Sequence, residues 1–257
     1  MSLHKKIRKR LIPIKSGLNK HAEDFAIESI NQLHLPKSIL IIPDGNGRWA
    51  KQMGLAISEG HKMGGKSMAR ILEHFIKLNI DVLGIWGFSE DNWKREKEEI
   101  DKIMEVMEST IKTNLAKLIK NNIKFFVLGK NEKIEKEYPS LFNEMLNAID
   151  KTAQNTSKKL VLFVDYGERF QLEEFAKARK IDKSSSTYEI LSKVNKGLPM
   201  FDMVLRTSGE LRLSGFGPLA EMAEFVSVKK NLPDLEDRDI IGALKEYSGR
   251  QRRFGGR

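Results

Sequence analysis

The sequence contains no cysteine among its 257 residues. This absence excludes disulfides, Fe–S clusters, thiolate metal sites and a cysteine nucleophile. The sequence also lacks any apolar run near the length of about 18 residues that a membrane-spanning helix needs, and its first residues lack the apolar segment of a signal peptide. We therefore expect a cytoplasmic protein without a membrane span.

Acidic residues are in deficit, because 45 Lys and Arg outnumber 35 Asp and Glu and give a formal net charge of +10. This balance favours anionic partners, namely nucleic acid, phosphorylated metabolites or an acidic membrane surface. Nucleic acid is the weakest of the three, since the sequence carries no recognition module for it.

A basic cluster, Lys5 to Arg10, lies near the N-terminus, and a weakly amphipathic stretch follows from Ala22 to Leu35. Such a segment can rest peripherally on anionic lipid, although a solvated arm is the commoner outcome. We therefore divide the chain into a basic N-terminal arm, residues 1–36, and one domain, residues 37–257, which is long enough to bury a substantial core.

Strand and helix patterns alternate along this domain. Helical spacing of apolar residues is clearest over Ser58–Leu78 and Glu96–Ile119. Near-continuous apolar runs predict strands at Ile39–Ile42, Asp81–Phe88, Ile123–Leu128, Lys159–Val164, Asp202–Leu205 and Phe225–Val228. This alternation is typical of the α/β class, and it predicts a single mostly parallel β-sheet of about six strands flanked by helices.

Polar clusters follow four of these strands, at Asp44–Arg48, Ser89–Arg95, Asp165–Arg169 and Arg206–Ser214. In open α/β sheets, ligands bind at the carboxyl ends of the strands. We therefore expect five arginines to converge on one cleft: Arg48, Arg95, Arg169, Arg206 and Arg212. Because five guanidinium groups would repel one another at low effective dielectric, their convergence predicts a polyphosphate ligand.

The first cluster carries the clearest chemistry. Gly45 and Gly47 allow turns that other residues avoid, so their amides can point at an anion, and Arg48 adds a fork for phosphate. Asp44 is placed to hold Mg²⁺ or to accept a proton. A solvated Asx turn is the alternative for a bare DGNG sequence, but the Arg and Trp49 that follow weigh against it.

Five blocks occur in order along the chain: DGNGRWA at 44–50, GHKMGG at 60–65, FSEDNWKR at 88–95, DYGERF at 165–170 and RTSGELRLSGF at 206–216, with RRFGG at 252–256. Together they resemble the blocks of the cis-prenyltransferases, the undecaprenyl diphosphate synthase family. One block alone would be weak, whereas the set is highly specific and covers residues 38–256. The resemblance implies the cis-prenyltransferase fold and a Mg²⁺-dependent transferase that lengthens an allylic diphosphate with isopentenyl diphosphate to a Z-polyprenyl diphosphate.

The resemblance also implies a role for each matching residue. Asp44 matches an essential aspartate that handles Mg²⁺ and the diphosphates, and Asn92 and Ser89 match residues near the proton that isopentenyl diphosphate loses. The pocket for the allylic diphosphate corresponds to Gly45, Asn46, Gly47, Arg48 and His61, and the loop that closes over the reacting ends includes Arg95. Trp49 and Trp93 are either substrate walls or core aromatics, and both readings stay open.

The site for isopentenyl diphosphate corresponds to Arg206, Arg212 and Ser214. In homodimers of the family it is completed by a neighbouring subunit, through the element that Arg253 and Gly255 match here. Glu224 matches an acidic residue that assists with Mg²⁺ across the same interface, and Glu221 is its competitor because the segment before it is one residue shorter than usual.

Other positions depart from the family pattern. Ile57 occupies a position where the family usually has an Arg that donates to a diphosphate, and Glu96 replaces a Pro. Asp165 and Glu168 stand where Asn and Gly are usual, and Gly217 and Pro218 replace bulky apolar residues. These changes motivate an alternative, a head-to-middle coupling enzyme that makes a short branched diphosphate. A non-catalytic partner subunit is a further alternative, against which the retained Asp44 argues.

Overall fold

The computed structural model describes residues 27–253. Its six strands form one sheet in the order β3-β4-β2-β1-β5-β6, and every neighbouring pair is parallel. The strands are β1 (Ser38–Ile42), β2 (Val82–Ser89), β3 (Ile123–Leu128), β4 (Lys158–Tyr166), β5 (Met203–Arg206) and β6 (Glu224–Ser227). The predicted α/β sheet of about six strands is confirmed, with each strand within two residues of its expected position.

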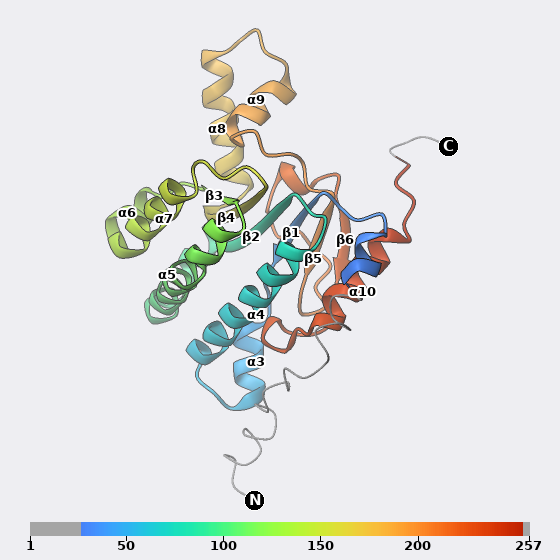
Figure 1. The fold of residues 1–257 in the computed structure, drawn as a ribbon. Coiled ribbons are helices and arrows are strands. Elements are labelled where there is room, and N and C mark those ends of the chain that lie inside the picture. The colour runs from blue at the N-terminus through green and yellow to red at the C-terminus, as the bar shows by residue number, and fades with distance from the viewer. Residues whose placement is uncertain (1–26, 254–257) are drawn as a thin grey trace, which may run out of the picture.

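Helices connect successive strands from β1 to β5, whereas β5 and β6 are joined by a loop that contains a short 3₁₀ turn (Figure 1). They are α3 (Asn46–Met53), α4 (Ile57–Lys77), α5 (Lys97–Lys120), α6 (Glu132–Glu137), α7 (Pro139–Lys151), α8 (Glu168–Ile181), α9 (Thr187–Val194) and α10 (Asp237–Ser248). Short 3₁₀ turns lie at η1 (Glu90–Lys94), η2 (Pro218–Ala220) and η3 (Leu232–Asp234). The sequence did not predict α3, α6 or any of these 3₁₀ turns.

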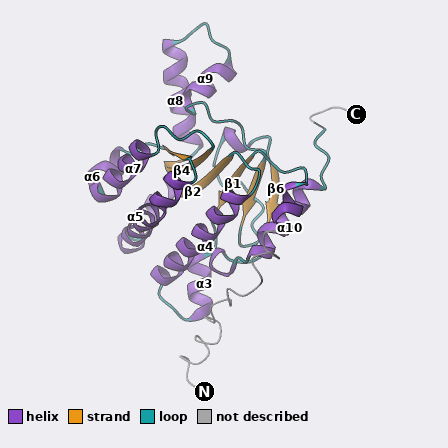
Figure 2. Ribbon diagram, viewed as in Figure 1, coloured by secondary structure: helices purple, strands orange, loops and turns teal. Residues whose placement is uncertain are grey.

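The alternation of side chains along β1 divides the core between the two faces of the sheet. Ile39 and Ile41 belong to a cluster built mainly from α4, α5, α7 and α10, which cover one face (Figure 2). Leu40 and Ile42 belong to a second cluster on the other face, which is rich in aromatic residues from segments 163–170 and 201–216. Both faces are therefore buried, which explains why the strands are almost continuously apolar.

The described end of the N-terminal segment packs against the first cluster. Residues 27–31 are helical, and Ile27, Ile30 and Leu35 are buried in it. The core therefore reaches back beyond residue 37. The basic cluster from Lys5 to Arg10 and the expected site residue Gly255 lie outside the described residues. Among the helices that are described, none is both long and apolar enough to cross a bilayer.

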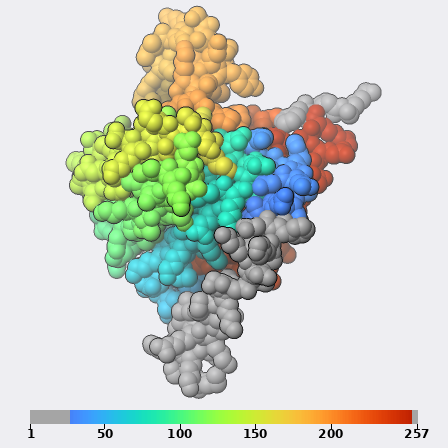
Figure 3. Space-filling view, in the orientation of Figure 1, coloured from blue at the N-terminus to red at the C-terminus, as the bar shows by residue number. Residues whose placement is uncertain are grey.

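Helices α8 and α9 pack against each other and project from the body of the molecule as a lobe (Figure 3). The lobe carries apolar side chains that are largely exposed in the single chain, namely Leu172, Ile181 and Tyr188.

Candidate active site

A cleft opens at the carboxyl ends of β1, β2 and β5, the edge at which a parallel sheet binds ligands. It brings together most of the residues that the sequence singled out. Those that line it are Asp44, Gly45, Asn46, Gly47, Arg48, His61, Ser89, Asn92, Arg95, Arg206 and Ser214.

The DGNG block forms the start of helix α3, which explains its glycines. Gly45 caps the helix with φ 96°, in the left-handed region, and a Cβ there would collide with Ser208 Oγ. The first helical hydrogen bond runs from Trp49 N to Gly45 O at 2.8 Å. The N–H groups of Asn46 and Gly47 precede it and have no intrahelical acceptor, so the positive end of the helix faces the cleft.

Asp44 lies at the centre of the cleft, where each carboxylate oxygen accepts a hydrogen bond from an arginine. Oδ1 is 2.8 Å from Arg48 Nη2, and Oδ2 is 2.9 Å from Arg206 Nη2. Burial alone would raise the pKa of Asp44, but the hydrogen bonds from Arg206 and Arg48 outweigh it and hold the pKa below its ordinary value. Asp44 is therefore an anion at neutral pH.

Thr207 holds the backbone of Asp44 in place. Its buried hydroxyl accepts from Asp44 N and donates to Asp44 O, both at 2.7 Å. Because Thr207 follows β5 and Asp44 follows β1, this pair of bonds ties the ends of two neighbouring strands. Thr207 is one of the functional positions that the sequence reading passed over, although it lies inside the RTSGELRLSGF block.

A second polar chain crosses the cleft floor through His61. Asn46 Nδ2 lies 3.3 Å from His61 Nδ1, and His61 Nε2 lies 3.2 Å from Glu99 Oε1. Arg95 donates to the same Glu99 oxygen at 2.8 Å. Burial lowers the pKa of His61 despite the opposing effect of Glu99, which fits a neutral imidazole that donates from Nε2 and accepts at Nδ1. Glu99 was not foreseen, because the acidic first turn of α5 reads as helix-dipole compensation.

The 3₁₀ turn η1 carries the remaining polar residues. Ser89 N donates to Asn92 Oδ1 at 3.0 Å, so the amide NH₂ of Asn92 is the end left for the cleft. Trp93, on the same turn, points away: its ring packs edge to face on Phe88 and lies 3.9 Å beneath Lys133 Nζ. Trp93 therefore lines a separate hollow, and the core reading of this residue is the one that the geometry supports.

Trp49 also belongs to the core. It is buried, and its Nε1 donates to Asp234 Oδ1 at 2.9 Å. It follows Gly47 and Arg48 by only one or two positions, but the helical rotation of α3 turns it to the opposite side from the cleft.

The expectation that five arginines converge is wrong for Arg169. Its guanidinium pairs with Asp91 at 3.0 Å and lines the hollow behind η1. Arg212 does not line the cleft either, although its backbone carbonyl accepts from Arg206, and its side chain pairs with Glu210 at the rim.

Mutual repulsion of the arginines does not by itself require a polyphosphate ligand, because every one of these guanidinium groups has a carboxylate partner. The pairs are Arg48 with Asp44 and Glu210, Arg95 with Glu99, Arg169 with Asp91, Arg206 with Asp44, and Arg212 with Glu210. The cleft is therefore a network of ion pairs that an anionic ligand would enter by exchange.

Glu224 does not join Asp44 within one chain. It opens β6 beside Met203, at the amino edge of the sheet, and pairs with Arg250 at 3.0 Å. Glu221 is exposed on the same side, after η2. The C-terminal segment runs along this edge, because Arg252 pairs with Asp202 at 2.7 Å just before β5 begins. Arg253 follows it and so lies at the opposite end of β5 from Arg206.

The residues present suit Mg²⁺ of the kind that is bound together with substrate. The part of the chain that the structure describes holds no group of three His, Asp or Glu that could bind a metal by itself. Mg²⁺ is commonly bound through one or two carboxylates plus substrate phosphates. Asp44 supplies one such carboxylate beside an anion-binding helix start.

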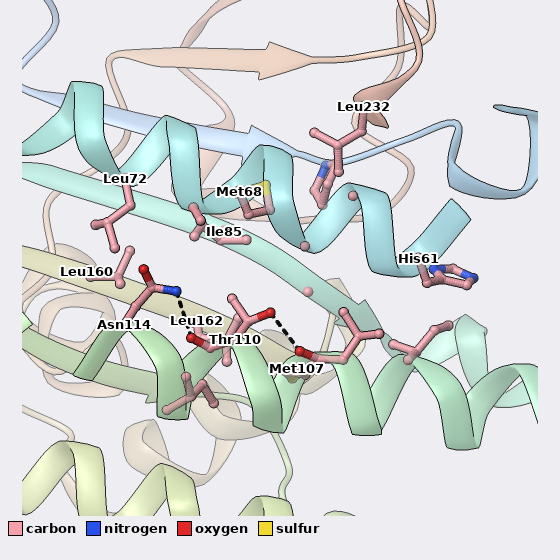
Figure 4. A pocket seen from close by; sticks show the side chains of 18 of the residues that line it. His61, Met68, Leu72, Ile85, Met107, Thr110, Asn114, Leu160, Leu162 and Leu232 are labelled. Carbon is pink, nitrogen blue, oxygen red and sulfur yellow. Dashed lines mark hydrogen bonds between the residues drawn. The ribbon is translucent and has the colours of Figure 1, made fainter. Parts of the chain in front are cut away.

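An apolar cavity continues from the cleft between α4 and α5 (Figure 4). The two spaces share Pro43, Asn46, His61, Gly87 and Ile103 as walls. Small residues keep it open, since a Cβ on Gly87 would lie 3.0 Å from Leu162 Cδ1 and one on Gly65 would lie 3.0 Å from Val106 Cγ1. A polar head and an apolar tail of one ligand can thus be bound end to end.

Two of the departures can now be located. Ile57 begins α4 with 46% of its surface exposed, and its Cγ2 would be 3.8 Å from a Cβ on Gly47. An apolar side chain therefore borders the anion-binding turn. Asp165 is buried behind η1 and has φ 48°, and burial raises its pKa. Asp165 does not line the cleft, so the change to Asp adds no charge to the cleft wall.

Comparison with known proteins agrees with this geometry. A family described as "Putative undecaprenyl diphosphate synthase" matches residues 42–255, which is most of the chain. The chain belongs to the undecaprenyl diphosphate synthase family. The resemblance read from the blocks is confirmed, and with it the expectation of a prenyl-transferring enzyme.

Relatives in this family are similar over nearly their full length. An isoprenyl transferase of Fusobacterium nucleatum subsp. nucleatum is 36% identical, with 87% of this chain and 97% of the relative covered. One from Clostridium tetani is 34% identical, with 93% and 97% covered.

Two solved structures share the fold. Lavandulyl diphosphate synthase of Lavandula x intermedia, in complex with dimethylallyl diphosphate, superposes with a TM-score of 0.79 at 27% identity, covering 88% of this chain and 99% of that one. A probable undecaprenyl diphosphate synthase of Campylobacter jejuni superposes with a TM-score of 0.71 at 27% identity, covering 86% and 98%.

Proposed function

We propose that this synthase-family chain elongates an allylic diphosphate with isopentenyl diphosphate, in a Mg²⁺-dependent reaction that makes a new cis double bond. The observation that carries the proposal is the continuity of the arginine-lined cleft with the apolar cavity between α4 and α5. A growing prenyl diphosphate has an anionic head and an apolar chain in the same arrangement.

The allylic head binds at the start of α3 in this proposal, where the free N–H groups and Arg48 receive its oxygens. Isopentenyl diphosphate binds beside Arg206, whose Nη1 donates to Ser214 Oγ at 2.8 Å and so holds that hydroxyl in the cleft. Entry of the two diphosphates exchanges the carboxylate partners of these arginines for phosphate, which releases Asp44.

In the reaction, the bond between the allylic carbon and its diphosphate oxygen breaks, and the double bond of isopentenyl diphosphate supplies the electron pair for the new C–C bond. Positive charge then develops on C3 of the isopentenyl unit, and loss of a proton from C2, the carbon that also bears the CH₂–diphosphate side, gives the new C2=C3 double bond. Mg²⁺, when bound, stabilises the charge that develops on the leaving diphosphate. Asn92 presents its NH₂ where it can orient the diphosphate near that proton, and the neutral His61 holds Asn46 in position.

The head-to-middle alternative is favoured by the departures at Ile57, Gly217 and Pro218 and by the likeness to a lavandulyl diphosphate synthase. The isoprenyl transferases, at 32% identity or more, resemble the chain more closely in sequence than that enzyme does at 27%. Elongation is therefore the function we favour.

We propose a homodimer as well. Arg253 follows the Arg252 anchor at the amino edge of the sheet, so it is held away from the cleft of its own chain. The exposed apolar residues of the α8–α9 lobe provide a surface for a second copy. Cytoplasmic location, with peripheral contact of the basic segment with a membrane, remains part of the proposal.

The test is to incubate the protein with Mg²⁺, labelled isopentenyl diphosphate and dimethylallyl, geranyl or farnesyl diphosphate, and to size the products. Linear cis products that lengthen with time support elongation. A branched product from dimethylallyl diphosphate supports head-to-middle coupling, and no incorporation with any primer overturns both.

A further inference from the structure

Beyond its mouth at Asn46 and His61, the apolar cavity between α4 and α5 is lined by one amide side chain, that of Asn114. Its other walls are apolar apart from the mouth and Thr110. Thr110 is satisfied by its own helix, since its hydroxyl donates to Val106 O at 2.7 Å. Figure 4 shows Asn114 pointing into the cavity toward Leu160 and Leu72, at the end away from His61.

The amide of Asn114 is only half satisfied. Nδ2 donates to Thr110 O at 2.8 Å, whereas Oδ1 accepts no hydrogen bond within residues 27–253. The residue is 7% exposed, and Oδ1 is not among the fully buried side-chain atoms that lack a partner, so water in the cavity can reach it. Covering Oδ1 with a prenyl chain is unfavourable, because hydrocarbon cannot replace the hydrogen bond that water gives to this oxygen.

We infer that Asn114 limits the length of prenyl chain that the cavity accepts; this rests on the proposed elongation. A chain that grows from the cleft first meets apolar wall, and each added unit buries more apolar surface. When its end reaches Asn114, the gain from the next unit is offset by the desolvation of Oδ1. Elongation slows at that length, and the product distribution peaks there.

The position of Asn114 on α5 gives the length in isoprene units. It follows Ile103, a wall of both cleft and cavity, by eleven residues, or about 16 Å at 1.5 Å per residue. An isoprene unit adds four chain bonds, roughly 5 Å at the advance per bond of an extended backbone. The amide is therefore met by about the third or fourth unit beyond Ile103.

Substitutions of Asn114 test the inference in opposite directions. Asn114→Leu keeps the branched shape of the side chain but removes the polar atoms, and it shifts the main product to greater length by at least one isoprene unit. Asn114→Asp places a carboxylate in the channel and shifts the main product to shorter length. Asn143→Leu, at an exposed position on α7, is the matched control and leaves the distribution unchanged.

A binding series separates this inference from the proposed activity. Prenyl diphosphates of increasing length are titrated without Mg²⁺ and followed by their effect on the melting temperature, which also reports whether each variant is folded. For the natural chain, affinity rises with each unit and then levels off; for Asn114→Leu, it continues to rise, with a difference on the order of tenfold at the longest ligand. If both proteins level off at the same length, Asn114 has no such role, even where the elongation assay succeeds. If elongation fails but the binding difference appears, the proposed activity falls and the length limit stands.

Discussion

The guanidinium of Arg206 lies against the carboxylate of Asp44, with 2.9 Å between Nη2 and Oδ2. Arg206 is only 5% exposed, and its position at the end of β5 is fixed by the sheet. Since Asp44 N and O are both bound to Thr207, neither partner can move far. The pair therefore places a fixed anion and a fixed cation where the two substrate heads are proposed to meet.

Asp44→Asn should lower kcat at least about a hundredfold, because the amide keeps the shape of the carboxylate but loses the charge that Mg²⁺ needs. The substitution also frees Arg48 and Arg206 from their shared anion, so inorganic diphosphate should raise the melting temperature of the variant at least as much as that of the natural protein. Turnover assays and thermal melts check the two parts. A rate within tenfold of the natural protein would show that Asp44 was misassigned.

Removal of Mg²⁺ should abolish turnover. In the absence of substrate, the protein should bind Mg²⁺ only weakly. Both oxygens of Asp44 are engaged by arginines there, and no second acidic group of the described residues completes a metal site. Calorimetric titration with Mg²⁺ should give heat only when methylenediphosphonate, an inert diphosphate, is also present. Tight binding of Mg²⁺ alone would contradict the exchange of partners that we propose.

Ile57→Arg should lower the KM for the allylic primer about three- to tenfold, because it adds a charged donor beside the anion-binding turn at Gly47. The side chain is already half exposed, so little desolvation opposes the change. Steady-state kinetics with each primer measures the effect. Ile119→Arg, on the far end of α5, adds the same charge at a similarly exposed position and serves as control. An unchanged KM for Ile57→Arg would mean that this position does not reach the primer.

The sequence predicted the sheet and the cleft because both follow from local pattern. An uninterrupted apolar run such as Ile39–Ile42 predicts a buried strand. Polar residues that follow such strands, such as Asp44 and Arg206, must meet at one edge of a parallel sheet. The predictions were wrong where the direction of a side chain depends on its position around a helix or on a partner distant in sequence. Trp49 turns into the core because α3 begins at Asn46, a start hidden in a glycine-rich block.

The sequence also could not predict which side chains form ion pairs or hydrogen bonds with one another. Arg169 pairs with Asp91 and lines the hollow behind η1, and Glu99 lies 3.2 Å from His61 although 38 positions separate them. Residue spacing could not indicate either pair, since both depend on how η1 and α5 pack against other elements.

The stability of the fold should decrease as the pH falls below about 6.5, in part through His61. Burial lowers the pKa of His61, so the folded protein binds this proton more weakly than the unfolded chain does. Acid therefore favours unfolding, and the contribution is fully present only above the ordinary histidine pKa. His61→Gln should flatten the melting temperature between about pH 6.5 and 5, whereas His34→Gln, at an exposed position, should keep the slope of the natural protein. Equal slopes for the natural protein and His61→Gln would exclude this role.

Mixing two impaired variants should restore activity if Arg253 serves a neighbouring subunit. Arg253→Ala should weaken the isopentenyl diphosphate site, and Asp44→Asn should inactivate the other component of the mixture. A mixed dimer contains one site with an intact Asp44 from one subunit and an intact Arg253 from the other. Random reassociation of equal amounts should therefore recover about a quarter of the natural activity, since half of the dimers are mixed and each has one intact site. If Arg253 acted within its own chain, every site with an intact Asp44 would still lack it, and the mixture would be no more active than Arg253→Ala alone.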